Sequence, residues 1–453
     1  MVIKKKGVNV KEEKTIIICI YCGLLISLLI AGSRSAWGHT FDNYGFGSRA
    51  IAMGSAMVGF DDQYTAVYYN PAGMAFHEGK DENLGFSFLY TVPELKINGS
   101  KPKSQTGGKR IYPDEGISVG YATPLGSGKI AEVISYGLGV YAPYPVTLYI
   151  VELKSFDPSV PYFVQYENRN RFLIVTGAVS YKAWKKLAFA AGIDLMLGII
   201  PMTANVGIGK EVKIGLDARL PLDLAPTAGI QYRPTDWLSL GAAYHGKTQV
   251  KVVIPANITL PSPSSETIPL LVTFRDVYKP QQVEMGFGVK PLKGLLISGA
   301  LSWVNFANYV PPVLKIKLNS NSPLAGSMEK LLNQFITTYT YEFKDYWIPR
   351  FGVEYKVTSH LDARAGYFYR NSSVPAQIGD TSFIDPPTHG VGAGIGISFS
   401  DPLDIIPNPV KVDFAYQGHF LQKVTVTKAS TANQSYSAGG SCHLVTGTLM
   451  YFF

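Results

Sequence analysis

The chain has 453 residues, and only 16% of them are charged, whereas glycine (45) and tyrosine (28) are abundant. A hydrophobic content of 46% with a mean hydropathy of +0.09 fits neither a helical membrane protein nor a disordered chain. The formal net charge is +8, but residues 39–453 carry 35 Lys and Arg against 31 Asp and Glu, so the charge does not indicate nucleic-acid binding.

Residues 1–38 are predicted to be an export signal. Five lysines between positions 4 and 14 precede an uncharged apolar run at 16–30. Such a run is shorter than the roughly 20 residues that a helix needs to span a bilayer. Ala36 and Gly38 approximate the small-residue pattern of a cleavage site. An uncleaved membrane anchor is the alternative.

Residues 39–83 are predicted to form a hatch, or plug. They contain GSRAIAMGSAMVG at 47–59, Asp61-Asp62, and AVYYNPAGM at 66–74. This stretch is too broken for a spanning strand and too apolar for a solvated tail, so it needs the lumen of a barrel to pack in. Asn70-Pro71 is a natural turn that would fix the following Ala72 and Gly73. A loose periplasmic extension is the alternative.

From residue 84 onward the dominant pattern has a period of two, which is typical of β-strands. The pattern predicts fourteen strands, at 84–97, 116–124, 132–142, 171–182, 187–202, 222–234, 237–254, 281–291, 294–309, 348–357, 361–371, 388–399, 410–422 and 442–453. The predicted fold class is all-β: a membrane-spanning antiparallel β-barrel of about 14 strands over residues 84–453, with the hatch in its lumen.

Three features favour a membrane barrel over a soluble sandwich. Many strands reach about ten residues, the length that a tilted strand needs to cross a bilayer. One face of the strands is rich in Tyr, Phe and Leu, and the other is often Gly, Ala or Ser. Short connections at 183–186, 234–236, 290–293 and 358–360 alternate with long ones at 98–115, 143–170, 203–221, 255–280, 310–347, 372–387 and 423–441. An even strand number with this alternation places both chain ends on the periplasmic side.

Two later segments allow more than one interpretation. Residues 294–314 are uncharged and long enough for a spanning helix, but Ser298, Asn305 and Pro311 favour a strand that runs into a loop. Residues 443–453 end in alternating aromatic side chains, which resembles the signal that the bacterial barrel-assembly machinery recognises.

The hatch sequence resembles that of the FadL family of outer-membrane long-chain fatty-acid transporters and their TodX-type relatives. The similar segments are 47–59, 61–62, 66–74, 139–143, 229–236, 238–241, 350–355 and 364–367. The resemblance implies uptake of fatty acids or of aromatic or alkane hydrocarbons by a fourteen-stranded barrel. It also implies ligand capture in an apolar groove between outer loops, a rearrangement of the hatch, and lateral exit through a kinked third strand.

Candidate site residues follow from the pattern and the resemblance together. The hatch candidates are Arg49, Asp61, Asp62, Asn70, Pro71, Ala72 and Gly73. The lateral-gate candidates are Gly137, Gly139 and Pro143, which would weaken the pairing of the third strand. The alternative is that these glycines only relieve crowding inside the barrel.

Two long loops supply the candidates for the ligand groove. They are Leu148, Ile150, Phe156, Tyr162 and Phe163 in one loop and Met328, Leu331, Leu332, Phe335 and Ile336 in the other. The second set has the spacing of one apolar helix face, which is unusual in an exposed loop unless it binds something. The alternative is that the two loops pack on one another.

Charged residues on the lumen faces of late strands are predicted to pair across the wall and to tether the hatch through Arg49, Asp61 or Asp62. These wall residues are Glu354, Lys356, Asp362, Arg364, Lys411 and Asp413. Ion pairs that only satisfy one another within the lumen are the alternative.

No enzymatic activity, cofactor or metal site is predicted. The seven histidines show no metal-ligand spacing, and no G-x-S-x-G motif occurs. Cys442 is the one cysteine outside the predicted leader, which excludes an intrachain disulfide there. The expected partners are a hydrophobic small-molecule ligand, outer-membrane lipid and lipopolysaccharide, and the assembly machinery; a monomer is expected. The alternative function is a structural or adhesin-type barrel that binds a partner through its long loops.

Overall fold

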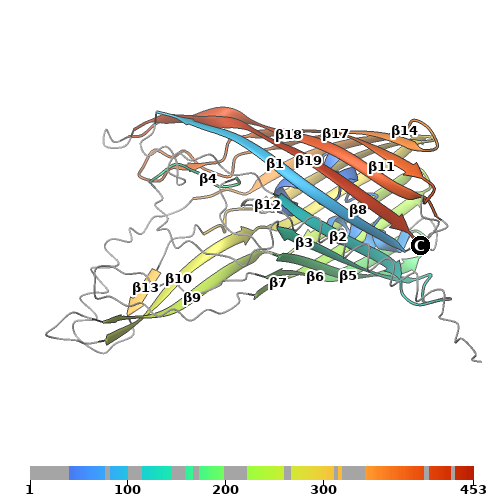
Figure 1. Ribbon diagram of the computed structural model, residues 1–453, viewed down its shortest axis with the longest axis horizontal. Helices are drawn as coiled ribbons and strands as arrows, with labels where there is room; N and C mark the ends of the chain where they lie inside the picture. Colours follow the sequence, from blue (N-terminus) through green and yellow to red (C-terminus); the bar gives the residue numbers. More distant parts are fainter. Residues whose placement is uncertain are drawn as a thin grey trace, which may run out of the picture.

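The computed structural model describes residues 40–76, 82–99, 115–143, 159–166, 173–197, 222–259, 267–310, 315–318, 342–401, 408–429 and 434–453. Within these residues, fourteen antiparallel strands close into a barrel (Figure 1). They are β1 (Asn83–Asn98), β2 (Glu115–Pro124), β3 (Ile134–Pro143), β5 (Leu173–Trp184), β6 (Leu187–Leu197), β7 (Leu222–Thr235), β8 (Leu238–His245), β11 (Gln281–Leu292), β12 (Leu295–Asn305), β14 (Tyr346–Lys356), β15 (Leu361–Arg370), β17 (Thr388–Phe399), β18 (Val410–Val426) and β19 (Tyr436–Phe452).

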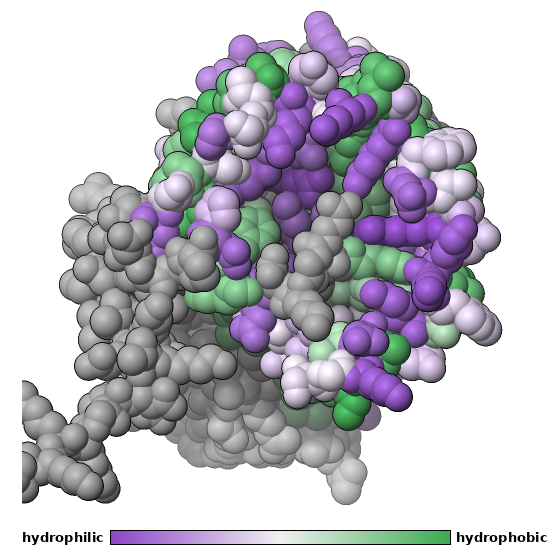
Figure 2. All heavy atoms as spheres, turned by 90° about the vertical axis from the view of Figure 1, so that its right-hand side faces the viewer, coloured by the Kyte–Doolittle hydropathy of each residue, from purple (hydrophilic) through white to green (hydrophobic). Residues whose placement is uncertain are grey.

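Pairing of the first strand with the last closes the barrel. The register of β1 with β19 runs without a break from Asn83↔Phe452 to Asn98↔Ser437. The short turns and the C-terminus share one end of the barrel, the short-turn end, on the right of Figure 1. We call the opposite end the long-loop end. Figure 2, viewed onto the short-turn end, shows hydrophilic side chains gathered around its rim.

The fourteen predicted barrel strands are confirmed, but several predicted boundaries are wrong. The predicted strand 237–254 is divided at Gly246 into β8 and β9 (Thr248–Thr259). The predicted loop 255–280 contains β10 (Thr267–Lys279), and β9, β10 and β13 (Lys315–Leu318) form a separate three-stranded sheet (Figure 1). A two-residue period identifies a strand but does not tell which sheet the strand joins, so the pattern could not separate the wall from this extension.

The other corrections concern the ends of loops. Strands β18 and β19 extend to Val426 and back to Tyr436, into the predicted loop 423–441. The predicted loops 143–170 and 372–387 contain the short parallel pair β4 (Tyr162–Phe163) and β16 (Phe383–Ile384). The segment 294–314 contains β12, which confirms the strand over the helix. Among the residues that the structure describes, no helix has both the length and the apolar character needed to cross a membrane.

The outer face of the barrel is a continuous set of exposed apolar side chains. They include Phe189, Ile193, Leu224, Met285, Phe351, Tyr355, Ile395, Phe414 and Val445. Water would solvate such a surface poorly, whereas lipid tails are an adequate solvent for it. This face is therefore the membrane-contacting surface of the barrel.

Residues 40–76, the lumenal segment, fill the interior of the barrel. The segment contains α2 (Thr40–Tyr44), α3 (Ser48–Ala52), α4 (Ala66–Tyr69) and η1 (Pro71–Phe76). Almost all of its residues are buried. Helix α3 contacts β15, β17, β18 and β19, and η1 contacts β5, β6 and β7. The segment therefore reaches wall strands on different sides of the lumen.

Rows of glycine on neighbouring strands make space for this segment. Gly85, Gly120 and Gly139 are paired in register across β1, β2 and β3, and Gly352, Gly366 and Gly392 across β14, β15 and β17. A Cβ atom on Gly366 would lie 2.1 Å from the backbone N of Gly54, which itself has a φ of +62°. Side chains at these positions would therefore exclude the lumenal segment.

We predict that Gly366→Ala destabilises the packing of the lumenal segment, whereas Gly177→Ala does not. A Cβ on Gly366 would meet backbone of the segment, and overpacking of this kind costs typically ~1–3 kcal/mol. At Gly177 the nearest atoms to an added Cβ are 3.9 Å away. Thermal unfolding of the purified proteins in detergent measures the difference. Equal midpoints for the two variants would contradict the glycine-row explanation.

Candidate functional site

The lumenal segment is joined to the barrel wall by a buried ion pair. Arg49 on α3 donates from Nε to Glu354 Oε2 (2.8 Å) and from Nη2 to Glu354 Oε1 (2.7 Å), and Nη1 lies 3.3 Å from Asp62 Oδ1. Two parallel hydrogen bonds of this kind fix both position and orientation. Burial alone disfavours the charged guanidinium, but Glu354 and Asp62 outweigh it and hold the pKa of Arg49 well above its ordinary value.

Glu354 also belongs to a chain of ion pairs along the wall. Arg364 Nε donates to Glu354 Oε2 (2.6 Å), and Arg364 Nη1 donates to Asp413 Oδ1 (2.7 Å). Lys411 Nζ lies 2.6 Å from Asp362 Oδ2, which is 3.3 Å from Arg364 Nη2. The structure thus brings together β14, β15, β18 and α3 through the lumen charges that the sequence singled out. Lys356, the remaining wall residue of that set, is exposed.

Asn70 forms a second connection between the lumenal segment and the wall. Its fully buried Nδ2, which carries two hydrogens, lies within hydrogen-bond distance of three acceptors: Val58 O (2.8 Å), Ile230 O (3.0 Å) and Gln231 Oε1 (3.1 Å). Its Oδ1 accepts from the backbone N of Ala72 (3.2 Å) and so caps the turn that begins η1. The Asn70 amide therefore connects the turn at the start of η1, Val58 of the lumenal segment and strand β7.

The residues after Asn70 are small because the backbone there passes close to Asp61. Pro71, Ala72 and Gly73 begin η1, and all three are buried. A Cβ on Gly73 would lie 2.0 Å from Asp61 O, so the backbone can pass Asp61 only with glycine at this position.

Asp61 is a fully buried carboxyl group with an incomplete hydrogen-bond shell. Its Oδ1 accepts from the backbone N of Gln63 (3.2 Å), and its Oδ2 has no hydrogen-bond partner among the described residues. Burial raises the pKa of Asp61 to about 7, although the charge of Arg49 opposes this shift. Asp61 therefore titrates near neutral pH, unlike an ordinary carboxyl group.

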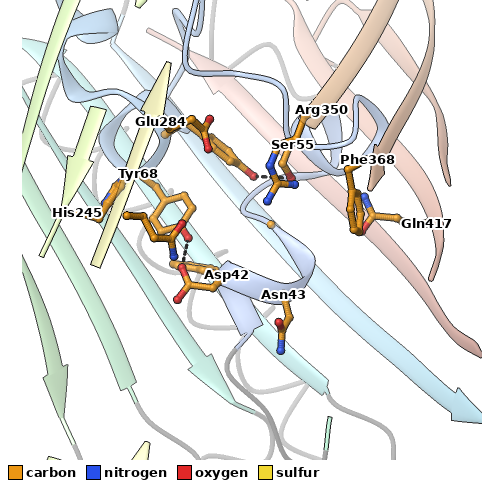
Figure 3. Close-up of a pocket in the computed structure, with 13 residues that line it drawn as sticks. Asp42, Asn43, Ser55, Tyr68, His245, Glu284, Arg350, Phe368 and Gln417 are labelled. Carbon is orange, nitrogen blue, oxygen red and sulfur yellow. Dashed lines mark hydrogen bonds between the residues drawn. The ribbon is translucent and has the colours of Figure 1, made fainter. Parts of the chain in front are cut away.

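The long-loop side of the lumenal segment contains a small polar cavity (Figure 3). Tyr68 donates to Asp42 Oδ1 (2.7 Å) at one side of it, and Tyr69 donates to Ser55 Oγ (3.3 Å) at another. The cavity volume is about 30 Å³, which is room for on the order of two water molecules.

A buried charge cluster next to this cavity was not predicted from the sequence. Lys279 Nζ, at the end of β10, lies 2.5 Å from Asp194 Oδ2 on β6, and His245 Nδ1 lies 3.7 Å from the same oxygen. The Lys279 ammonium also lies 5.4 Å from the ring centroid of Tyr68. The sequence feature that could have indicated this cluster is Asp194, a single charge on a face of β6 that otherwise consists of small residues and Met.

The lateral-gate candidates lie on a strand that is paired along both edges. The pairing of β3 runs from Gly116↔Pro143 to Pro124↔Ser135 on β2, and from Ile134↔Tyr181 to Tyr141↔Ile174 on β5. A Cβ on Gly137 would lie 2.5 Å from Met74 Sδ, and one on Gly139 would lie 3.2 Å from Val67 Cγ1. These glycines admit the lumenal segment, and an exit here would require the pairing of β3 to open.

The groove candidates are only partly within the described residues. Tyr162 and Phe163 form β4 and are buried against β16, so they pack inside the protein. The others, Leu148, Ile150, Phe156, Met328, Leu331, Leu332, Phe335 and Ile336, lie outside the described residues. In the described part of the chain, no group of three or more His, Cys, Asp or Glu side chains is placed to hold a metal ion.

We predict that Glu354→Gln loosens the lumenal segment. The change leaves the buried Arg49 and Arg364 guanidinium groups undercompensated, and breaking a buried pair costs roughly 3–5 kcal/mol. Ion conductance of the purified protein in planar bilayers should rise, and its unfolding temperature should fall. Lys356→Gln, an exposed change on the same strand, is the control and should leave both unchanged. Wild-type conductance in Glu354→Gln would show that this pair does not hold the segment.

We predict that seating of the lumenal segment weakens as the pH rises through about 7. The pKa of Asp61 in the folded protein lies above its ordinary value, so the associated stability is present at low pH and is lost as the buried carboxyl ionises near pH 7. Limited proteolysis of the segment between pH 5.5 and 8.5 measures this. Asp61→Asn should remove the pH dependence, and an unchanged profile in that variant would assign it to another group.

Comparisons with known proteins agree with this architecture. A family model described as outer membrane protein transport protein (OMPP1/FadL/TodX) matches residues 27–453. The chain is 22% identical over 450 residues to alkane uptake protein A of Marinobacter nauticus, and the alignment covers 93% of each protein.

Two solved structures show the same fold. A FadL homologue of Pseudomonas aeruginosa has a TM-score of 0.61 and 16% identity, with 93% of this chain and 99% of that chain covered. The toluene transporter TodX of P. putida has a TM-score of 0.57 and 15% identity, with 90% and 99% covered. The chain therefore belongs to the OMPP1/FadL/TodX family of outer-membrane transport proteins.

Proposed function

We propose that the protein carries small hydrophobic molecules across the outer membrane and that its lumenal segment is a movable plug. The observation that carries the proposal is a lumen filled by residues 40–76, which are held by hydrogen bonds and one ion pair. A porin for polar solutes needs an open aqueous bore, which this arrangement denies. Relatives named for alkane uptake and toluene transport support the hydrophobic class of substrate.

The proposed route leaves the barrel sideways through β3, at Gly137, Gly139 and Pro143. Lipid is a better solvent for an apolar molecule than water is, so a lateral exit avoids an aqueous step. Met74 and Val67 of the plug pack where a side chain on these glycines would be. Withdrawal of the plug would therefore leave β3 without packing on its inner face, so that only its pairing with β2 and β5 would keep the exit closed.

The proposed orientation places the short-turn end and both chain ends in the periplasm, with residues 1–38 as an export signal. The protein would act as a monomer, with lipopolysaccharide around its outer rim and the assembly machinery recognising its last strand. We retain the long loops as the place of initial ligand capture. The competing function is a structural or adhesin-type barrel, for which a plug that moves has no use.

Uptake of a substrate panel tests the proposal. We expect a deletion strain to lose uptake of at least one radiolabelled compound among toluene, n-octane and oleate, and to regain it with the cloned gene. If no compound in the panel depends on the protein, the transport function is wrong.

The same assay tests the plug through Asn70→Ala. Loss of the hydrogen bonds that the Asn70 amide donates should change the uptake rate without unfolding the barrel, because Asn70 is not part of a wall strand. Asn98→Ala, at an exposed strand end, is the matched control. Unaltered uptake in Asn70→Ala would leave the plug without a role in gating.

A further inference from the structure

The strands that close the barrel are its longest, and they extend beyond their neighbours at the long-loop end (Figure 1). Strand β1 has 16 residues, and β18 and β19 have 17 each. Near their outer ends, Leu95 and Ile97 of β1 and Val424 of β18 pack against an apolar cluster that includes residues of the lumenal segment. Successive residues of a strand point to opposite faces. Lys96, between Leu95 and Ile97, and Lys423, directly before Val424, therefore lie on the outer face.

Lys96 and Lys423 stand on either side of Gly439 in β19. Lys96 is the register partner of Gly439, and a Cβ on Gly439 would lie 3.2 Å from Lys423 Cα. Neighbouring strands are about 4.8 Å apart, so the backbones of the two lysines are separated by roughly 10 Å. The residue between them has no side chain. Both ammonium groups can therefore reach one anion that lies over Gly439.

Neither lysine has an anionic partner among the described residues. Both side chains are exposed, and neither forms an ion pair in this part of the chain. Glu94, which pairs with Ser441 one row nearer the short-turn end, is an exposed acidic residue on the same face. Two positive charges against one negative charge leave an excess of positive charge. A bound anion would relieve the repulsion between the two ammonium groups.

A band of aromatic and imidazole side chains lies on the short-turn side of the two lysines. The Tyr416 hydroxyl is 2.7 Å from His443 Nδ1, and the Tyr367 hydroxyl is 2.8 Å from His389 Nδ1. Side chains with an apolar ring and a polar end gather where a membrane meets water. Further toward the short-turn end the outer face is apolar, as at Phe414, which is 53% exposed. The band therefore marks the outer boundary of the apolar belt.

Lys96 and Lys423 lie just beyond this boundary, which is the level of lipid headgroups in a bilayer. In the proposed orientation, the long-loop end is in the outer leaflet, where lipopolysaccharide carries phosphate groups. A lysine close to an anionic lipid surface contributes a factor on the order of five to binding. The position of the pair and its charge thus both match a lipid phosphate.

We infer that Lys96 and Lys423 bind a phosphate group of one lipopolysaccharide molecule over Gly439, at the seam where β1 meets β19. The inference goes beyond the transport function and depends on the proposed orientation of the barrel. The bound lipid connects β1, β19 and β18 from outside. Because it binds only the folded wall, it stabilises the closure of the barrel.

Lipid binding to the purified full-length protein tests the site. Native mass spectrometry in detergent should show tight binding of lipid A that carries its phosphates and weaker binding of the same lipid A after chemical dephosphorylation. Lys96→Gln/Lys423→Gln should weaken binding of the phosphorylated lipid roughly tenfold, which corresponds to about 1.4 kcal/mol. Lys293→Gln/Lys356→Gln, which removes two exposed lysines at the short-turn end, is the matched control and should bind as the wild type does.

Two further variants separate a charge effect from a folding defect. Lys96→Arg/Lys423→Arg keeps both charges and should bind lipid A normally, whereas Glu94→Gln removes the acidic residue beside them and should tighten binding. Unchanged binding by Lys96→Gln/Lys423→Gln, or equal binding of the two forms of lipid A, would overturn the inference. Equally tight binding of inorganic phosphate alone would overturn lipopolysaccharide as the ligand. No outcome depends on uptake, so a failure of the transport function would leave this test intact.

Discussion

The two-point contact between Arg49 and Glu354 is the buried ion pair that joins the lumenal segment to the barrel wall. A guanidinium group buried inside a barrel is tolerable only when carboxylates face it, and here Glu354 and Asp62 do so. Because Glu354 is shared with Arg364, the position of the plug is tied to the ion pairs of the wall itself. The lumenal segment and the wall are thus joined in one connected charge network.

The glycine rows leave the space that the lumenal segment needs next to this network. Electrostatic attraction could not seat the plug if side chains occupied the inner face where the backbone of residues 51–54 meets β14, β15 and β17. Glycine costs stability in a strand because it has no side chain to pack. In this barrel the lumenal segment packs against these glycines. The wall and the segment therefore stabilise each other.

The sequence predicted the barrel well because a two-residue period directly reports which face of a strand is apolar. Lumen charges such as Glu354 and Arg364 could be singled out because they alternate with the apolar side chains of the opposite strand face. The pairing of Lys279 with Asp194 could not be predicted, because β10 belongs to a sheet that is separate from the barrel wall. The β4–β16 pair could not be predicted from the sequence either, because parallel pairing of two residues from distant loops leaves no local sequence pattern.

The sheet that projects from the barrel is continuous with the wall: β9 follows β8 after Gly246, and β10 leads into β11 through Pro280. Lys279 stands at this junction, where it meets both Asp194 and the ring of Tyr68. A shift of Lys279 would therefore change contacts of the projecting sheet, the wall and the lumenal segment together, and any coupling between the sheet and the segment acts equally in both directions. Through Lys279 the projecting sheet thus contacts the core of the barrel.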